Sequence, residues 1–274
     1  MIASRALLLV AIASLAVVGS LLAANKLPQV LAHRGASGSA PETTLASYRL
    51  ALGMKVDFLE LDVQMSRDGA LVAIHDPLVD RTTNGKGAVG EMTLTQLRAL
   101  DAGSWFNRTF PDRARPEFAG ERIPTLEEII ALAQPGTAGL YIETKNPELY
   151  PVEFEAKVVE LVRRRGFEKR VVIQSFNALS IEKVKKLAPE IPTALLVGTL
   201  QQEPVEATLR AGSRELAIDY RLLTAEIAKR ARAKGLTLTV WTVDDEGEMR
   251  RMMALGVDRI ITNFPERLNR LLGR

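Results

Sequence analysis

Residues 58–75 read FLELDVQMSRDGALVAIH, and this stretch decides the fold class. It contains two apolar strand candidates, at 58–65 and 71–75, on either side of the turn sequence Ser66-Arg67-Asp68-Gly69. A turn of this length cannot hold the crossover that two parallel strands need. We therefore expect the two strands to form an antiparallel hairpin.

Outside the hairpin, short runs rich in Val, Ile and Leu alternate with helical patterns, as in parallel sheets buried on both faces. Helices are predicted at 125–133, 152–165, 178–187, 224–234 and 245–255. With 58–65 as one of them, eight parallel strands remain, which is the number in a (β/α)₈ barrel of the TIM type. The other seven strand candidates are 30–33, 140–143, 171–174, 193–197, 215–219, 237–242 and 257–261.

Residues 77–124 depart from this alternation. They carry many Gly and Pro residues and one short helix candidate at 95–100. Long insertions in compact domains usually serve a site. We therefore predict one barrel domain over residues 27–274, with an insertion after the hairpin.

The first 26 residues are predicted to lie outside this domain. Residues 6–24 carry no charge and are flanked by Arg5 and Lys26. This pattern fits a signal peptide or an N-terminal membrane anchor, and the length of the run leaves both open. Either one implies that the rest of the chain is exported, to the periplasm or the cell exterior, with membrane association through residues 6–24 if the segment is retained.

Composition narrows the chemistry. The 274 residues include no Cys, which excludes disulfides, thiolate metal sites and thiol nucleophiles. After residue 26 the chain contains 34 Lys and Arg residues and 33 Asp and Glu residues, and this balance gives no reason to propose a nucleic acid partner. The chain has only two histidines, so imidazole chemistry must use His33 or His75.

Three carboxylates are predicted to share one site. Glu60 and Asp62 are two residues apart on a strand, so their side chains point to one face, which looks into the barrel. Glu143 ends another strand, with Lys145 on the same face. An all-oxygen set of this kind suits Mg²⁺ or Ca²⁺, and Mn²⁺ also fits. On pattern alone, the Glu60–Asp62 pair could also face solvent and Lys145 could be a surface residue.

The histidines are predicted to lie near these carboxylates. If the turn is centred near 67–68 or 68–69, hairpin pairing places His75 opposite Glu60 or Asp62. His33-Arg34-Gly35 closes the first strand, and the Arg34 guanidinium matches a phosphate group. Carboxylates, cations and imidazoles together indicate phosphoester chemistry. A structural role for each histidine is the alternative.

Seven short motifs, in order along residues 28–270, resemble those of the glycerophosphodiester phosphodiesterases. This resemblance implies a (β/α)₈ barrel that uses a divalent cation to hydrolyse glycerophosphodiesters to sn-glycerol 3-phosphate and an alcohol. The motifs are HRG at 33–35, PETT at 41–44, ELD at 60–62, HDP at 75–77, ETK at 143–145, QSF at 174–176 and WT at 241–242.

The resemblance also implies a role for each matching residue. His33 and His75 would be the general acid and base, in an order that the sequence leaves open. The metal ligands would be Glu60, Asp62 and Glu143, the phosphate would meet Arg34 and Lys145, the substrate pocket would be lined by Gln174, Phe176 and Trp241, and Glu42 would support the site.

Two positions depart from the family pattern. Thr43 stands where the family usually has Asn, and we expect this to tune the activity and not abolish it. Asn263 stands where the family often has Asp, and no role is assigned to it.

Two other functions remain open. The first is a lysophospholipase D or a phospholipase C-like activity on membrane lipid, favoured if Trp105, Phe106 and Phe110 form an apolar entrance; packing of these aromatic residues against the barrel is the competing interpretation. The second is a barrel that binds phosphodiesters without catalysis. The sequence does not identify the head group or the oligomeric state.

Overall fold

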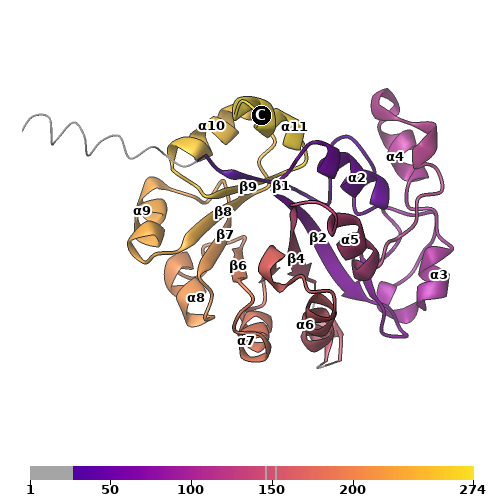
Figure 1. Ribbon diagram of the computed structural model, residues 1–274, viewed down its shortest axis with the longest axis horizontal. Coiled ribbons are helices and arrows are strands. Elements are labelled where there is room, and N and C mark those ends of the chain that lie inside the picture. The colour runs from indigo at the N-terminus through magenta and orange to yellow at the C-terminus, as the bar shows by residue number, and fades with distance from the viewer. Residues whose placement is uncertain (1–26, 146, 152) are drawn as a thin grey trace, which may run out of the picture.

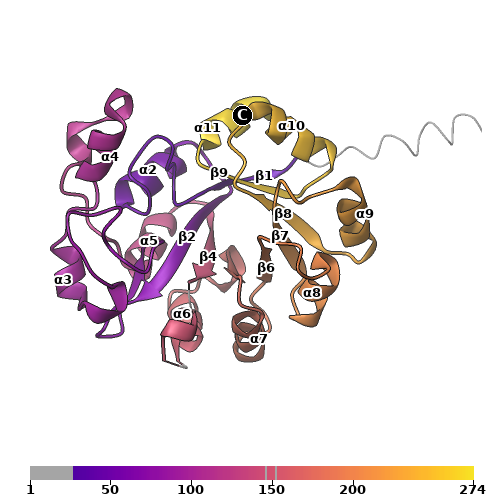
Figure 2. The ribbon, with the colours of Figure 1, turned by 180° about the vertical axis from the view of Figure 1, so that it is seen from behind.

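The structure is a computed structural model that describes residues 27–145, 147–151 and 153–274. Among these residues, eight parallel strands form a closed ring, because β1 pairs with both β9 and β2. Figures 1 and 2 show this ring with helices around it. The predicted (β/α)₈ barrel is confirmed. Its strands are β1 (Gln29–Ala32), β2 (Phe58–Met65), β4 (Gly139–Thr144), β5 (Val171–Ser175), β6 (Thr193–Val197), β7 (Glu215–Asp219), β8 (Thr237–Trp241) and β9 (Arg259–Thr262).

Eight helices of the described chain surround the ring. The sequence predicted five of them and missed α2, α8 and α11. Two of the missed helices, α8 and α11, have seven residues each, which is too short to show the helical spacing of apolar residues. The third, α2, buries Ser47, Tyr48 and Ala51, and its other apolar residues are spread around the helix, so no single apolar face marks it in the sequence. The helices are α2 (Leu45–Gly53), α5 (Leu126–Ala133), α6 (Phe154–Arg164), α7 (Ala178–Leu187), α8 (Pro204–Arg210), α9 (Ala225–Ala233), α10 (Glu246–Ala254) and α11 (Pro265–Leu271).

The core has two layers, because strand residues alternate between the two faces of the sheet. On β2, Leu59, Leu61 and Val63 point outward and pack against the helices. Residues from other strands, such as Leu31 and Tyr141, fill the inside of the barrel. The inward face of β2 carries Phe58 at its start, followed by Glu60, Asp62 and Gln64, and the last three are buried.

The predicted hairpin is present, but its register differs from the expectation. β3 (Leu71–Ala73) pairs antiparallel with β2, Val63 opposite Ala73 and Met65 opposite Leu71. This pairing is centred on Asp68, so its continuation would place His75 opposite Leu61. β3 ends at Ala73, however, so His75 lies beyond the strand. The predicted pairing of His75 with Glu60 or Asp62 is therefore wrong.

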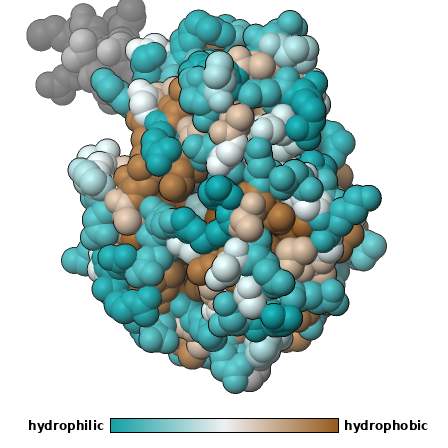
Figure 3. All heavy atoms as spheres, turned by 90° about the vertical axis from the view of Figure 1, so that its right-hand side faces the viewer, coloured by the Kyte–Doolittle hydropathy of each residue, from teal (hydrophilic) through white to brown (hydrophobic). Residues whose placement is uncertain are grey.

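Residues 77–124 contain no barrel strand and lie outside α2 and α5 (Figures 1 and 2). They form α3 (Leu94–Arg98), α4 (Ser104–Thr109) and short 3₁₀ turns. The ring of Phe106 is fully buried against Phe110, Phe118 and Trp105, which agrees with packing and not with an open apolar entrance. Figure 3 faces this side and shows a mainly hydrophilic surface with hydrophobic residues between.

Within the described residues, no helix has both the length and the hydropathy needed to cross a bilayer. The predicted signal peptide or anchor falls in residues 1–26, outside the described part of the chain.

Candidate active site

The three predicted metal ligands lie together inside the barrel. Glu60 and Asp62 come from β2 and Glu143 from the neighbouring β4, where Asp62 and Glu143 are register partners. One carboxylate oxygen of each lies within 4.8 Å of one oxygen of both others, and all three side chains are buried. Parallel pairing with a side-chain period of two produces this cluster.

The cluster concentrates negative charge in a region that excludes water. Burial and the neighbouring Asp62 raise the pKa of Glu60 well above its usual range and that of Glu143 to about 8. Burial also opposes ionisation of Asp62, but Arg34 and Lys145 outweigh it and lower the pKa of that carboxyl. Within the described residues, Asp62 Oδ2 accepts no well-aligned hydrogen bond, although the Arg34 guanidinium lies beside it. Buried, mutually close carboxylates are the donor set that a divalent cation satisfies.

Arg34 bridges these carboxylates to Glu42. Its Nε lies 3.2 Å from Asp62 Oδ2, its Nη1 donates to Glu42 Oε1 at 2.9 Å, and its backbone N–H donates to Glu60. The backbone of Arg34 is left-handed, with φ of 55°. This conformation is uncommon for a residue other than glycine, and residues held in such backbone regions cluster at functional sites.

His33 is held by an amide. Its Nδ1 donates to Asn263 Oδ1 at 2.7 Å, while Asn263 Nδ2 donates to Asp244 Oδ2 at 2.6 Å. With Nδ1 protonated, the neutral ring presents an unprotonated Nε2 to the site, 4.0 Å from Glu60 Oε2. Burial, followed by the charge of Arg34, lowers the pKa of His33 to about 4.

His75 is held by a carboxylate. Its Nδ1 donates to Asp76 Oδ1 at 2.6 Å, and its Nε2 accepts from Lys145 Nζ at 3.1 Å. Arg81, from the insertion, binds both Asp76 and Glu42, so the insertion is tied to the site. Burial lowers the pKa of His75, although Asp62 and Asp76 act in the opposite direction.

A glutamine replaces the strand pairing that was expected to place His75. The buried side chain of Gln64 donates from Nε2 to the carbonyl oxygens of Ile74, His75 and Asp76. The Tyr150 hydroxyl donates to Gln64 Oε1 at 2.7 Å and fixes the orientation of the amide. These contacts bind the segment beyond β3 at the mouth of the barrel.

The remaining predicted residues lie around the same end. Lys145 Nζ is 3.0 Å from Glu143 Oε1 and 3.8 Å from Asp62 Oδ1. Gln174 donates to Glu60 Oε1 at 3.1 Å, which makes it a neighbour of the carboxylate cluster. Phe176 is half exposed and meets Trp241 edge to face at 5.5 Å, so these two rings form an apolar wall at the mouth.

Sequence reasoning missed four residues of this site: Asn263, Asp76, Arg81 and Gln64. Asp76 had a signal, since it follows His75 directly, but it was not assigned a role. Arg81 lies in an irregular segment, and Asn263 is 230 residues from its partner His33, so neither had a local pattern.

Thr43, the other departure from the family pattern, has a left-handed backbone with φ of 55°. Its backbone N–H donates to the Arg34 carbonyl, and its hydroxyl donates to the Glu42 carbonyl. Asn tolerates this conformation far better than a β-branched residue does. The left-handed backbone therefore explains why the family usually has Asn where this chain has Thr43.

Comparisons with known proteins agree with this geometry. A sequence model described as "Glycerophosphoryl diester phosphodiesterase family" matches residues 33–267. A glycerophosphodiester phosphodiesterase of Bacillus subtilis is 40% identical over 257 residues, covering 90% of this chain and 87% of that protein. One from Caldanaerobacter subterraneus is 41% identical, covering 89% and 97%.

The fold also resembles solved structures. A phosphodiesterase of Oleispira antarctica, solved in complex with the product sn-glycerol-3-phosphate, has a TM-score of 0.83 at 31% identity and covers 90% of this chain and 98% of that one. A glycerophosphodiester phosphodiesterase of Agrobacterium tumefaciens has a TM-score of 0.75 at 32% identity, covering 88% and 98%.

Proposed function

Because the chain belongs to the glycerophosphoryl diester phosphodiesterase family and is a phosphoric diester hydrolase, we propose that it cleaves glycerophosphodiesters to sn-glycerol 3-phosphate and an alcohol, with His33 and His75 moving the protons. The observation that carries the proposal is the meeting of two imidazoles, two cationic side chains and a buried three-carboxylate cluster at one end of the barrel.

The carboxylate cluster fits a divalent cation. Glu60, Asp62 and Glu143 would hold it, and hard oxygen donors favour Mg²⁺ or Ca²⁺, with Mn²⁺ also suited. A cation bound there would stabilise the negative charge that develops on the phosphoryl oxygens.

His33 is proposed as the general base. Its Nδ1 proton is committed to the neutral amide of Asn263, which leaves Nε2 free to accept a proton. An amide partner does not stabilise an imidazolium as a carboxylate would. In the resting site His33 is therefore neutral and able to take the proton from an attacking hydroxyl group.

His75 is proposed as the general acid. Its Nδ1 donates to the Asp76 carboxylate, whose charge stabilises a protonated imidazole. In this structure Nε2 accepts from Lys145 Nζ, so His75 would first take up a proton at Nε2, and the imidazolium would then give that proton to the leaving alcohol. Lys145 and Arg34 would meet the phosphate oxygens, Lys145 as a point charge and Arg34 as a planar fork.

The first experiment measures release of sn-glycerol 3-phosphate from glycerophosphocholine by the full chain, with and without EDTA. We expect chelator-sensitive turnover, and His33→Ala and His75→Ala should each lower kcat by about 10²–10⁴-fold. Near-normal turnover in either variant would remove that histidine from the mechanism. Turnover that resists exhaustive chelation would remove the cation.

A second substrate separates the two histidines. A glycerophosphodiester with a p-nitrophenyl leaving group needs no protonation as it departs. His75→Ala should therefore recover most of its activity on this diester, and His33→Ala should not. The reverse pattern would exchange the two roles.

One observation favours a second candidate, hydrolysis of a lysophospholipid. A pocket of about 450 Å³ opens beside Phe176 and is lined partly by Leu195 and Val197, and Leu179 and Leu200 are exposed nearby. Lysophosphatidylcholine is therefore the comparison substrate. A higher kcat/KM for it than for glycerophosphocholine would assign the enzyme to lysolipid hydrolysis.

Export remains part of the proposal. It is supported by the uncharged segment 6–24 between Arg5 and Lys26. Fractionation of cells that carry the tagged full chain tests it, and a cytoplasmic protein would contradict it.

A further inference from the structure

Charge in this protein is sorted along the barrel axis. We define the amino-end face as the segments that lead into the strands or end the chain (53–57, 134–138, 165–170, 188–192, 211–214, 234–236, 255–258 and 272–274) together with the last four residues of each of the eight barrel helices. This face carries sixteen Lys and Arg against four Asp and Glu. The rest of the chain beyond residue 26 carries 18 against 29. Eight of the sixteen cations pair with carboxylates, and six of these carboxylates lie outside the defined segments: Glu127, Glu160, Glu203, Glu206, Glu246 and Glu248. With these pairing partners included, the face carries sixteen cations against ten carboxylates and is net positive.

The sorting follows from the fold. All eight helices end at the amino-end face, and basic side chains stabilise the negative end of a helix dipole. Such residues close six of the helices, among them Lys186 on α7 and Arg210 on α8. Because the helices are parallel, these local preferences add up to one positive surface.

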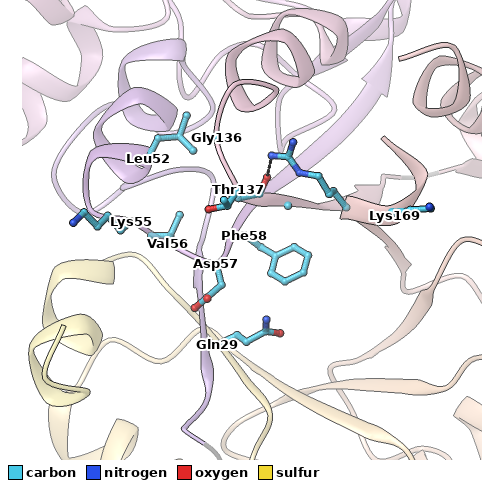
Figure 4. A pocket seen from close by; sticks show the side chains of 12 residues that line it. Gln29, Leu52, Lys55, Val56, Asp57, Phe58, Gly136, Thr137 and Lys169 are labelled. Carbon is cyan, nitrogen blue, oxygen red and sulfur yellow. Dashed lines mark hydrogen bonds between the residues drawn. The ribbon is translucent and has the colours of Figure 1, made fainter. Parts of the chain in front are cut away.

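Four exposed cations on this face are available to a partner. Lys55, Lys169, Lys186 and Arg214 form no ion pair and no side-chain hydrogen bond within the described residues. Beside two of them is a pocket of about 530 Å³, with Lys55 and Lys169 on opposite sides of it (Figure 4). The carboxylate in this pocket, Asp57, is neutralised by Arg274 at 2.7 Å.

The chain enters the domain at the same face. β1 starts at Gln29, so four residues separate it from Ala24, the last residue of the uncharged segment. Five residue steps span about 18 Å at most. Two exposed leucines lie nearby: Leu27, at 51%, just before β1, and Leu187, at 43%, at the end of α7 on this face. A retained segment 6–24 would therefore hold the basic face within reach of a bilayer surface.

The barrel is closed at this end. Glu215 accepts a hydrogen bond from the Tyr141 hydroxyl and pairs with Arg259, whose guanidinium lies over the Phe58 ring. The axis is therefore filled at this end, and the carboxylate cluster lies toward the other end. Asp62 lies four residues, about 13 Å, along β2 from Phe58.

We propose that the amino-end face docks on an anionic bilayer surface, with residues 6–24 as the anchor, so that the catalytic mouth faces away from the membrane. Each unpaired cation near an anionic leaflet favours this docking. The substrate then comes from solution, and a lipid in the supporting bilayer cannot reach the site. This inference rests on retention of the N-terminal segment and deepens the proposed function by restricting its substrates to soluble diesters.

The test uses the absence of cysteine. In the full chain, Thr137→Cys labels the amino-end face and Thr199→Cys labels the loop after β6 at the mouth, and both threonines are exposed. Each variant receives a fluorophore and is placed in vesicles of phosphatidylcholine and phosphatidylglycerol that carry a head-group quencher. We expect at least fivefold stronger quenching at position 137 than at 199. Equal quenching, stronger quenching at 199, or a chain that does not stay on the vesicles would overturn the proposal.

A charge-reversed control tests the docking surface itself. Lys55→Glu, Lys169→Glu, Lys186→Glu and Arg214→Glu are combined in the Thr137→Cys chain. Quenching should fall several-fold in anionic vesicles, and turnover of soluble glycerophosphocholine should be unchanged. Undiminished quenching would contradict the role of these cations. Turnover reports the proposed chemistry separately, so failure of the docking and failure of the proposed function give different results.

Discussion

The hydrogen bond from His33 to Asn263 leads to a quantitative prediction for the variant Asn263→Ala. The variant removes the acceptor that holds Nδ1 of His33 at 2.7 Å. The side chain of His33 is 17% exposed, so its N–H group would lose a bond that water replaces poorly. An unmet buried donor costs about 1–3 kcal/mol. If that energy is lost from the orientation that presents an unprotonated Nε2, the productive fraction falls about 5–150-fold.

The assay is steady-state hydrolysis of glycerophosphocholine, with kcat and KM measured separately. We expect the loss in kcat, because His33 acts on protons and is not assigned to substrate binding. Asn269→Ala is the matched control: Asn269 is also buried, but it donates to the Met54 carbonyl outside the site. The control should lower Tm and leave kcat unchanged. An Asn263→Ala variant with the kcat of the parent chain would refute the reasoning.

A second measurement exchanges the amide of Asn263 with the carboxylate of Asp244. Asn263→Asp alone places a carboxylate against Asp244, where the amide now donates at 2.6 Å, and should be destabilising. Adding Asp244→Asn restores a donor and acceptor pair, with the carboxylate now facing His33. Because a carboxylate raises the pKa of a neighbouring imidazole, the acid limb of the kcat/KM profile should move to higher pH in the double variant. An unmoved limb would contradict the assignment of His33 as the base.

Three further outcomes are expected. Thr43→Asn relieves a left-handed β-branched residue and should raise stability by about 1 kcal/mol, or Tm by about 2–4 °C in thermal unfolding; a lower Tm would contradict this. Without metal, burial and Asp62 raise the pKa of Glu143 to about 8, whereas the same carboxyl in the unfolded chain releases its proton near pH 4.5. Between these two pH values the folded chain binds more protons than the unfolded chain, so its stability falls as the pH rises. Thermal scans should accordingly show that Mg²⁺ or Ca²⁺ raises Tm more at about pH 8 than at about pH 5, and an equal rise would oppose cation binding at this cluster. Phe176→Ala removes half of the apolar wall and should raise KM several-fold with little change in kcat, so a purely catalytic loss would argue against a binding role.

The parts of the site that follow from a local period were predictable. The alternation on β2 fixed the direction of Glu60 and Asp62, and parallel pairing brought Glu143 beside them. The position of His75 was not predictable in detail, because a hairpin register depends on the number of residues in the turn, and one residue changes the pairing. Here the side chain of Gln64, and not a strand, holds the segment that carries His75.

The fold was predicted on the same basis. Strands and long helices show a periodic pattern of apolar residues. The helices α8 and α11 have seven residues each and begin at a proline, which marks where a helix can start but does not reveal an apolar face. The role of Asn263 could not be read from a single sequence, since its contact with His33 exists only when β9 closes against β1.

That last contact bears on how the enzyme folds. Glu60, Asp62 and His75 lie within 16 consecutive residues and can approach one another as soon as one hairpin forms. The His33–Asn263 hydrogen bond joins positions 230 residues apart in the sequence, and a contact with so large a sequence separation forms only when the two ends of the barrel domain meet. We therefore expect catalytic competence to arise late in refolding, after most of the helical signal, so that turnover during refolding reports the moment at which the first and last strands join.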